Sequence, residues 1–168
     1  IKVLLASVLV QLCLGGVYAW STFVPPLQDE HGFSSAQTQI IFGTAIDAFT
    51  LAMIPAGRSL SRYGTRRLIQ ISGLLFSLGY FLAAASGGSF ILMLLGIGVI
   101  GGAGIGCGYV CPMITALSWY PHKRGLAIGY VVAGFGAGAI VLVNATALAF
   151  NRGIGVLPWF ACLRLGYG

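Results

Sequence analysis

The feature that most constrains this chain is the length of its uncharged stretches. Residues 68–121 contain no charged side chain and no histidine, and the same is true of residues 3–28 and 125–151. A helix needs about 20 apolar residues to cross a hydrocarbon core about 30 Å thick. The longest stretch therefore suits two crossings. Only 7% of the residues are charged, against about a quarter in soluble domains, so we predict an all-α membrane protein.

The boundaries of the expected helices follow from breaks in the apolar pattern. Pro25 and Pro26 fix φ and remove two N–H donors, which predicts the end of the first helix. The chain begins at Ile1 rather than at a methionine and stops at Gly168 inside an apolar segment, so we expect a piece of a longer protein. Five complete helices are expected at about residues 3–24, 37–56, 68–86, 90–119 and 124–149, with part of a sixth at 157–168.

The basic residues predict how the helices are oriented. If five helices alternate in direction, seven of the nine basic residues fall on one side of the membrane. Basic turns mark the cytoplasmic side, which predicts a multi-pass protein of the plasma (inner) membrane with a cytoplasmic N-terminus. This distribution explains the net charge of +6, and no basic stripe with interleaved aromatics favours nucleic acid. The seven residues are Lys2, Arg58, Arg62, Arg66, Arg67, Lys123 and Arg124.

The glycines of residues 90–119 favour helix packing over nucleotide binding. The string from Gly96 to Gly101 matches GxGxxG, but that fingerprint requires a preceding strand and a helix N-terminus. Here the string lies inside an apolar run. Glycines four residues apart, as at Gly102 and Gly106, remove side chains from one helix face and allow another backbone to approach closely. The same spacing recurs later in the chain, at Gly134 and Gly138.

The composition offers little chemistry for catalysis. The four cysteines lie in or near apolar runs, and we interpret them as small packing residues. No paired carboxylates, metal-spaced histidines or Ser/His/Asp set occur within the expected helices. We therefore expect no metal, no cofactor and no enzymatic activity.

Two polar positions inside the expected helices are candidate functional residues. Gln11 shares a face with Ser7 and Tyr18, and this face should look into the bundle or into a water-filled cavity. Asp47 lies near the middle of the second helix, beside Thr50. It is interpreted either as a proton-linked or substrate-linked acid, or as a carboxylate that hydrogen-bonds neighbouring hydroxyls and joins two helices.

The segment from Gly57 to Arg67 resembles the signature loop of the major facilitator superfamily, GxLADRxGRRR. The glycines and three of the arginines match, but Ser61 stands where the family has an aspartate, so the charged latch of the family is in doubt here. The resemblance implies a gating role for the cytoplasmic turns, at Gly57, Arg58, Ser61, Arg62, Gly64, Arg66, Arg67, Lys123 and Arg124.

Two further segments resemble the oxalate:formate antiporter branch of this superfamily, which is close to the monocarboxylate transporters. They are the run from Gly16 to Leu27 and the block around the sequence WYPHKRG. The resemblance implies a bundle of two six-helix halves with one central site, of which this chain is the first half. It also implies a small carboxylate substrate and a binding wall that includes Tyr18 and Tyr109. Gln11 and Trp20 complete the expected substrate-binding set, although the aromatic residues could instead pack helices or anchor the membrane interface.

We therefore expect secondary transport of small organic anions by alternating access. The expected partners are the carboxylate, membrane lipid, and a second half or partner helices. The alternative is a truncated or accessory membrane protein that pairs with other helices without transporting anything. A membrane-embedded enzyme is disfavoured, because the chain lacks a convergent set of catalytic groups.

Overall fold

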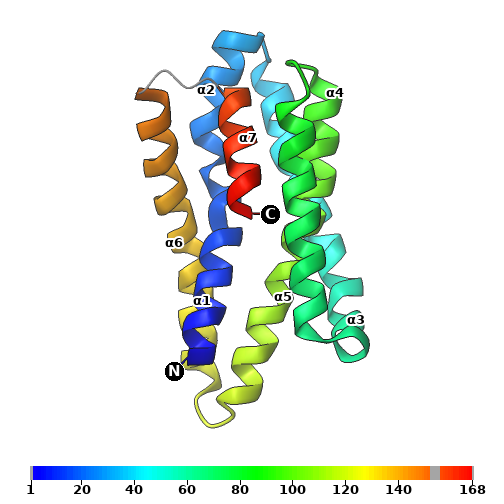
Figure 1. Cartoon of the computed structure of the whole chain (residues 1–168), viewed down its shortest axis with the longest axis vertical. Coiled ribbons are helices and arrows are strands. Elements are labelled where there is room, and N and C mark those ends of the chain that lie inside the picture. Colours follow the sequence, from blue (N-terminus) through cyan, green and yellow to red (C-terminus); the bar gives the residue numbers. More distant parts are fainter. Residues whose placement is uncertain (1, 152–155, 168) are drawn as a thin grey trace.

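The computed structural model describes residues 2–151 and 156–167, and every regular element in that part of the chain is a helix (Figure 1). The fold class predicted from the sequence is confirmed. The first rod of helix consists of three segments that follow one another without a gap. These are α1 (Lys2–Leu14), the 3-10 helix η1 (Gly15–Ala19) and α2 (Trp20–His31).

The expected end of this rod at Pro25 and Pro26 is wrong, because the helix runs through both prolines. The stop comes at Gly32, which adopts the left-handed conformation (φ 68°) and donates its N–H to the carbonyl of Gln28 at 3.0 Å. Glycine ends helices in this way because it carries no Cβ to clash. Pro25 is solvent-exposed and close to the helix end, so its lost hydrogen bond is tolerated.

Helix α3 (Ser35–Ala84) contains two membrane-length halves joined by one residue. Ser34 caps its start in a reciprocal capping box with Gln37. The chain reverses at Gly64, where φ is 76° and ψ is 160°, a conformation essentially restricted to glycine. The expected loop over residues 57–67 is therefore wrong, because helix continues on both sides of Gly64.

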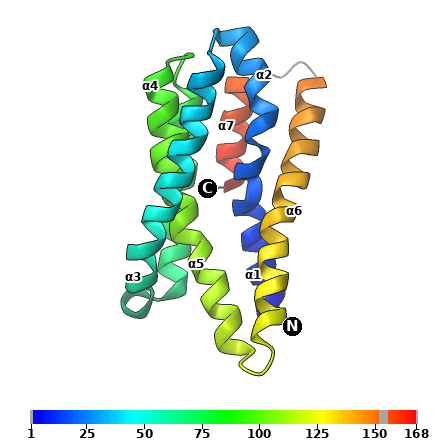
Figure 2. The same ribbon diagram turned by 180° about the vertical axis from the view of Figure 1, so that it is seen from behind.

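The remaining helices complete the bundle. The third rod consists of α4 (Phe90–Met93), a π-helix η2 (Leu94–Gly101) and α5 (Gly102–Trp119), and it is followed by α6 (Arg124–Asn151) and α7 (Val156–Tyr167). In the described part, four continuous helical stretches are long and apolar enough to cross a membrane: the first rod, α3, the third rod and α6. Because α3 reverses at Gly64, each of its two halves is one potential crossing. Seen from behind, α5 and the α1–α2 rod lie between the first half of α3 and α6 (Figure 2).

The glycines of α5 allow it to approach both halves of α3, as the spacing predicted. One face packs on the first half, where a Cβ at Gly102 or Gly106 would meet the backbone of Ala45 or Phe49. The opposite face packs on the second half, where a Cβ at Gly104 would lie 2.8 Å from a backbone nitrogen. Close backbone approach of this kind is the main route to tight helix packing in lipid.

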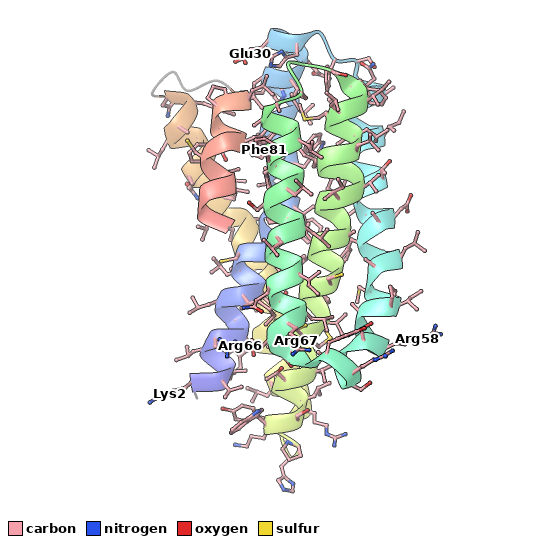
Figure 3. All side chains as sticks on the ribbon, turned by 45° about the vertical axis from the view of Figure 1, so that its right-hand side comes forward. Lys2, Glu30, Arg58, Arg66, Arg67 and Phe81 are labelled. Atoms are coloured by element: carbon pink, nitrogen blue, oxygen red, sulfur yellow. The ribbon has the colours of Figure 1, made fainter. Side chains whose placement is uncertain are left out.

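The two ends of the bundle differ in charge. Lys2, Arg58, Arg66 and Arg67 lie at one end and Glu30 lies at the other (Figure 3). The turn between α5 and α6, which carries Lys123, lies at the same end as the reversal of α3. We call this end the basic end. The sequence-based expectation that the basic turns share one side is confirmed for these residues.

Candidate functional site

Four aromatic side chains from four helices meet near the middle of the bundle. They are Tyr18 of η1, Phe49 of α3, Tyr109 of α5 and Phe135 of α6, and we call them the aromatic cluster. Phe135 is central. Its ring centroid lies 5.5 Å from that of Tyr18 and 4.9 Å from that of Tyr109, with both rings nearly perpendicular to it. Phe49 stacks on Phe135 at 6.3 Å and meets Tyr109 edge-on at 5.4 Å.

The two tyrosines of the aromatic cluster present free hydroxyls. Tyr18 is 50% exposed and Tyr109 is partly buried, whereas Phe135 beneath them is buried. In residues 2–151 and 156–167, neither tyrosine hydroxyl has a hydrogen-bond partner. A phenol can donate one hydrogen bond to an oxygen acceptor. The cluster therefore offers two donors on an apolar aromatic floor.

Glycines hold the cluster in place by bringing α6 against the first rod. A Cβ on Gly15 would run into the backbone carbonyl of Phe135, and a Cβ on Gly134 would lie 2.9 Å from Val8. The local 3-10 winding of η1 then carries Tyr18 to the same side as Phe135. The two aromatic rings can meet only because these positions carry no side chain.

Gln11 lies behind the cluster and is fully buried. Its Nε2 donates a long hydrogen bond, 3.5 Å, to the backbone carbonyl of Tyr109. Its Oε1 is the one buried side-chain oxygen or nitrogen in the described part of the chain that lacks a partner. An unpaired buried acceptor costs about 1–3 kcal/mol. Gln11 thus links α1 to α5 directly beneath Tyr109.

Trp20 does not join the aromatic cluster. Its ring is buried at 7% exposure, and its Nε1 donates to the backbone carbonyl of Thr38 at 3.1 Å. The centroid of the ring lies 6.4 Å from that of Phe23. Trp20 also lines an apolar cavity, together with Tyr80. The structure therefore places Trp20 between α2 and α3, with its polar group satisfied.

Asp47 lies on an exposed face of the first half of α3, together with Gly43 and Thr50. Thr44 turns away from this face and contacts the position of Gly98 in η2. Asp47 makes no ion pair or hydrogen bond with the described residues, and Thr50 donates its hydroxyl to Ile46 of its own helix at 2.9 Å. A single carboxylate is thus presented near the middle of a membrane-length helix.

The residues expected to form a gating loop are helical apart from Gly64, which leaves the helical conformation, and Lys123, which lies in the turn before α6. Arg58 and Arg62 lie one turn apart and are exposed, and the hydroxyl of Ser61 donates to the carbonyl of Arg58 at 3.1 Å. The other expected gating residues are Gly57 in α3, Arg66 and Arg67 after the reversal, Lys123 in the turn between α5 and α6, and Arg124, the first residue of α6.

Two members of the cluster, Phe49 and Phe135, were not predicted from the sequence. No local signal in the sequence marks them, because it is the structure that places Phe49 opposite Gly106 and Phe135 opposite Gly15. In the described part of the chain, no three His, Cys, Asp or Glu side chains are grouped to hold a metal ion. The thiol of Cys111 is buried and lies 3.5 Å from the carbonyl of Cys107.

Comparison with known families identifies this helical bundle. The model of the Major Facilitator Superfamily matches residues 4–162. The chain belongs to the major facilitator superfamily. The match covers both the aromatic cluster and the reversal at Gly64, so the site lies within the transporter fold. The membership predicted from the signature loop is confirmed.

Several curated relatives are named as transporters or carriers. An uncharacterized MFS-type transporter of Escherichia coli is 29% identical over 82% of this chain and 34% of its own length. Apicoplast pyruvate carrier 1 of Toxoplasma gondii is 28% identical over 90% of this chain and 35% of its own length. The oxalate:formate antiporter of Oxalobacter formigenes is 30% identical over 97% of this chain and 39% of its own length. The chain thus spans somewhat more than a third of the length of these relatives.

Proposed function

We propose that the protein carrying this chain transports small carboxylates by alternating access, and that this chain forms one half of the transporter. The observation that carries the proposal is the aromatic cluster with its two unpaired tyrosine hydroxyls. Pockets for small molecules combine apolar walls with a few well-placed polar groups. The names of two relatives, an antiporter for oxalate and formate and a pyruvate carrier, support the same class of substrate.

Transport requires selective, reversible binding and no bond breaking. Tyr18 and Tyr109 would each donate a hydrogen bond to a carboxylate oxygen. The edges of the Phe49 and Phe135 rings, which carry the positive part of the ring quadrupole, would face the anion. Gln11 would act indirectly, by holding α5 at Tyr109. Trp20 would shape the wall of the groove that it lines together with Tyr18, with its own N–H held by the carbonyl of Thr38.

Coupling and orientation are the second part of the proposal. Asp47 would carry a proton or balance the charge of the substrate, because it is the one acidic residue in the described helices that lies far from a helix end, whereas Asp29 and Glu30 lie in the last turn of α2. The basic end would face the cytoplasm, which places the N-terminus there in a plasma (inner) membrane protein. The arginines around Gly64 would stabilise one closed state of the carrier.

The test is counterflow in liposomes with the full gene product. We expect labelled oxalate, formate or pyruvate to accumulate against an unlabelled carboxylate inside. Tyr18→Phe and Tyr109→Phe, which remove only the hydroxyls, should each raise KM about tenfold, the value of one hydrogen bond to a charged group. Phe81→Leu, at an exposed position of α3 outside the cluster, serves as the matched control. Absence of counterflow with every carboxylate would contradict the proposal.

A non-transporting role is favoured by a different observation. Gly129 and Gly136 of α6 are exposed, and an added Cβ at either would meet nothing within 4 Å. Such a face suits another helix. If the protein only pairs with membrane partners, cross-linking at Gly129 should capture a partner while counterflow is absent.

A further inference from the structure

The basic end of the bundle carries many cations and no acid to neutralise them. The three acidic residues of the chain lie elsewhere: Asp29 and Glu30 close α2, and Asp47 lies within the first half of α3. The arginines and lysines of this end make no ion pair with any residue that the structure describes. The charge at this end is therefore open to an anion from outside these helices.

Beside these cations lies a groove between α3 and α5, which we call the turn groove. Its volume is about 440 Å³, within the range of roughly 300–1,000 Å³ found for small-molecule sites. One part of its lining is apolar and the other part carries hydroxyls. The apolar part contains Leu60, Ile114 and Trp119, and the hydroxyl part contains Ser61, Thr65 and Ser118.

The hydroxyls of the turn groove are arranged mainly to accept hydrogen bonds. Ser61 already donates to the carbonyl of Arg58, and Ser118 donates to the carbonyl of Ile114 at 2.9 Å. Their oxygens retain lone pairs. Arg58 and Arg62 do not line the groove, but both are exposed and lie within one turn of Ser61, which does line it. The groove therefore combines acceptors and an apolar wall, and two long cationic side chains start from the helix beside it.

We propose that the turn groove binds one anionic phospholipid whose headgroup carries hydroxyls. The phosphate would lie on Arg58 and Arg62, since guanidinium groups bind phosphate in a bidentate manner. Headgroup hydroxyls would donate to Ser61 and Ser118. An acyl chain would lie on Trp119, which is 67% exposed. A lipid fits better than a soluble anion because the apolar wall adjoins the cations.

The fluorescence of Trp119 provides the test. The full gene product that carries this chain is placed in phosphatidylcholine nanodiscs that contain a small fraction of either brominated phosphatidylglycerol or brominated phosphatidylcholine. The contribution of Trp119 is obtained by comparison with Trp119→Phe. We expect brominated phosphatidylglycerol to quench Trp119 more strongly at equal fraction, and excess glycerol phosphate in solution to leave this quenching unchanged. Equal quenching by the two lipids, or relief by glycerol phosphate, would overturn the proposal.

A charge-matched pair of variants separates a defined site from diffuse attraction. Arg58→Gln with Arg62→Gln removes the two cations that border the groove. Arg66→Gln with Arg67→Gln removes the same charge after the reversal, away from Arg58 in Figure 3. We expect the first pair to weaken the preference for phosphatidylglycerol about thirtyfold and the second pair to keep most of it. Equal losses in the two pairs would overturn the proposal. So would an absence of quenching by either lipid, which would mean that a protein segment covers the groove.

Discussion

At the scale of single residues, the contact between α6 and α1 depends on positions that carry no side chain. A Cβ on Gly138 would meet the carbonyl of Leu12 and lie 3.0 Å from Gly15, whereas a Cβ on Gly136, half a turn away, would meet nothing within 4 Å. The two glycines therefore form a matched pair on one helix. One is required by packing, and the other is free to change.

We predict that Gly138→Ala lowers the free energy of unfolding in mild detergent by about 1–3 kcal/mol, because the added methyl overpacks the helix contact. Gly136→Ala should leave it unchanged or raise it by up to about 1 kcal/mol, because alanine favours helix over glycine. The measurement is unfolding by titration with a denaturing detergent. Equal effects of the two substitutions would contradict the close packing of α6 on α1.

A substitution of Gln11 can test whether its buried, unpaired side-chain oxygen is needed for transport. Methionine has a similar volume and removes the unpaired Oε1, at the loss of one 3.5 Å hydrogen bond to Tyr109. We predict that Gln11→Met raises the free energy of unfolding by about 1 kcal/mol or more and lowers the rate of carboxylate counterflow. A variant that is both less stable and equally active would show that Gln11 is only structural.

The sequence reached part of the site. Tyr18 and Tyr109 were identified by resemblance, and the structure brings both into contact with Phe135. Phe49 and Phe135 were missed, because a phenylalanine among many apolar residues carries no local signal. Their place is set by which backbones approach one another, as at Gly15. Trp20 lines one groove with Tyr18, but it packs on α3, where its Nε1 donates to the carbonyl of Thr38, and it makes no ring contact with the cluster.

At the scale of elements, the reversal at Gly64 joins two membrane crossings through one residue. Its φ of 76° and ψ of 160° suit only glycine. We predict that Gly64→Ala lowers the free energy of unfolding by about 1–3 kcal/mol. Gly57→Ala is the matched control, because that glycine is helical and its added Cβ would lie 4.0 Å from Val110. Stability losses of equal size would contradict the strained turn.

The existence of the helices was easier to predict than their ends. Long uncharged runs predicted five membrane crossings, because a segment buried in lipid must be uncharged and must satisfy its backbone hydrogen bonds within a helix. The end predicted for the first rod at Pro25 and Pro26 was wrong. Near a helix terminus, water can replace the hydrogen bonds that prolines remove, so the helix continues through them. Gly32 carried the true stop signal. The arginine-rich segment that looked like a loop is helix, because only Gly64 leaves the helical conformation.

At the scale of the whole molecule, the account depends on five membrane crossings that alternate in direction. The basic turns then share one side, and the end of α2 lies on the other (Figure 3). The turn groove and the proposed direction of transport both follow from this arrangement. It leaves exposed residues at each end that can be labelled separately, including Tyr63, His122 and Glu30.

The most direct measurement of this claim is the labelling of single cysteines in sealed vesicles with a membrane-impermeant maleimide, after the four native cysteines are replaced by serine or alanine. The account predicts that Tyr63→Cys and His122→Cys react from the same side of the membrane and that Glu30→Cys reacts only from the opposite side. Labelling of Tyr63→Cys and His122→Cys from different sides, or of Glu30→Cys together with either, would contradict it.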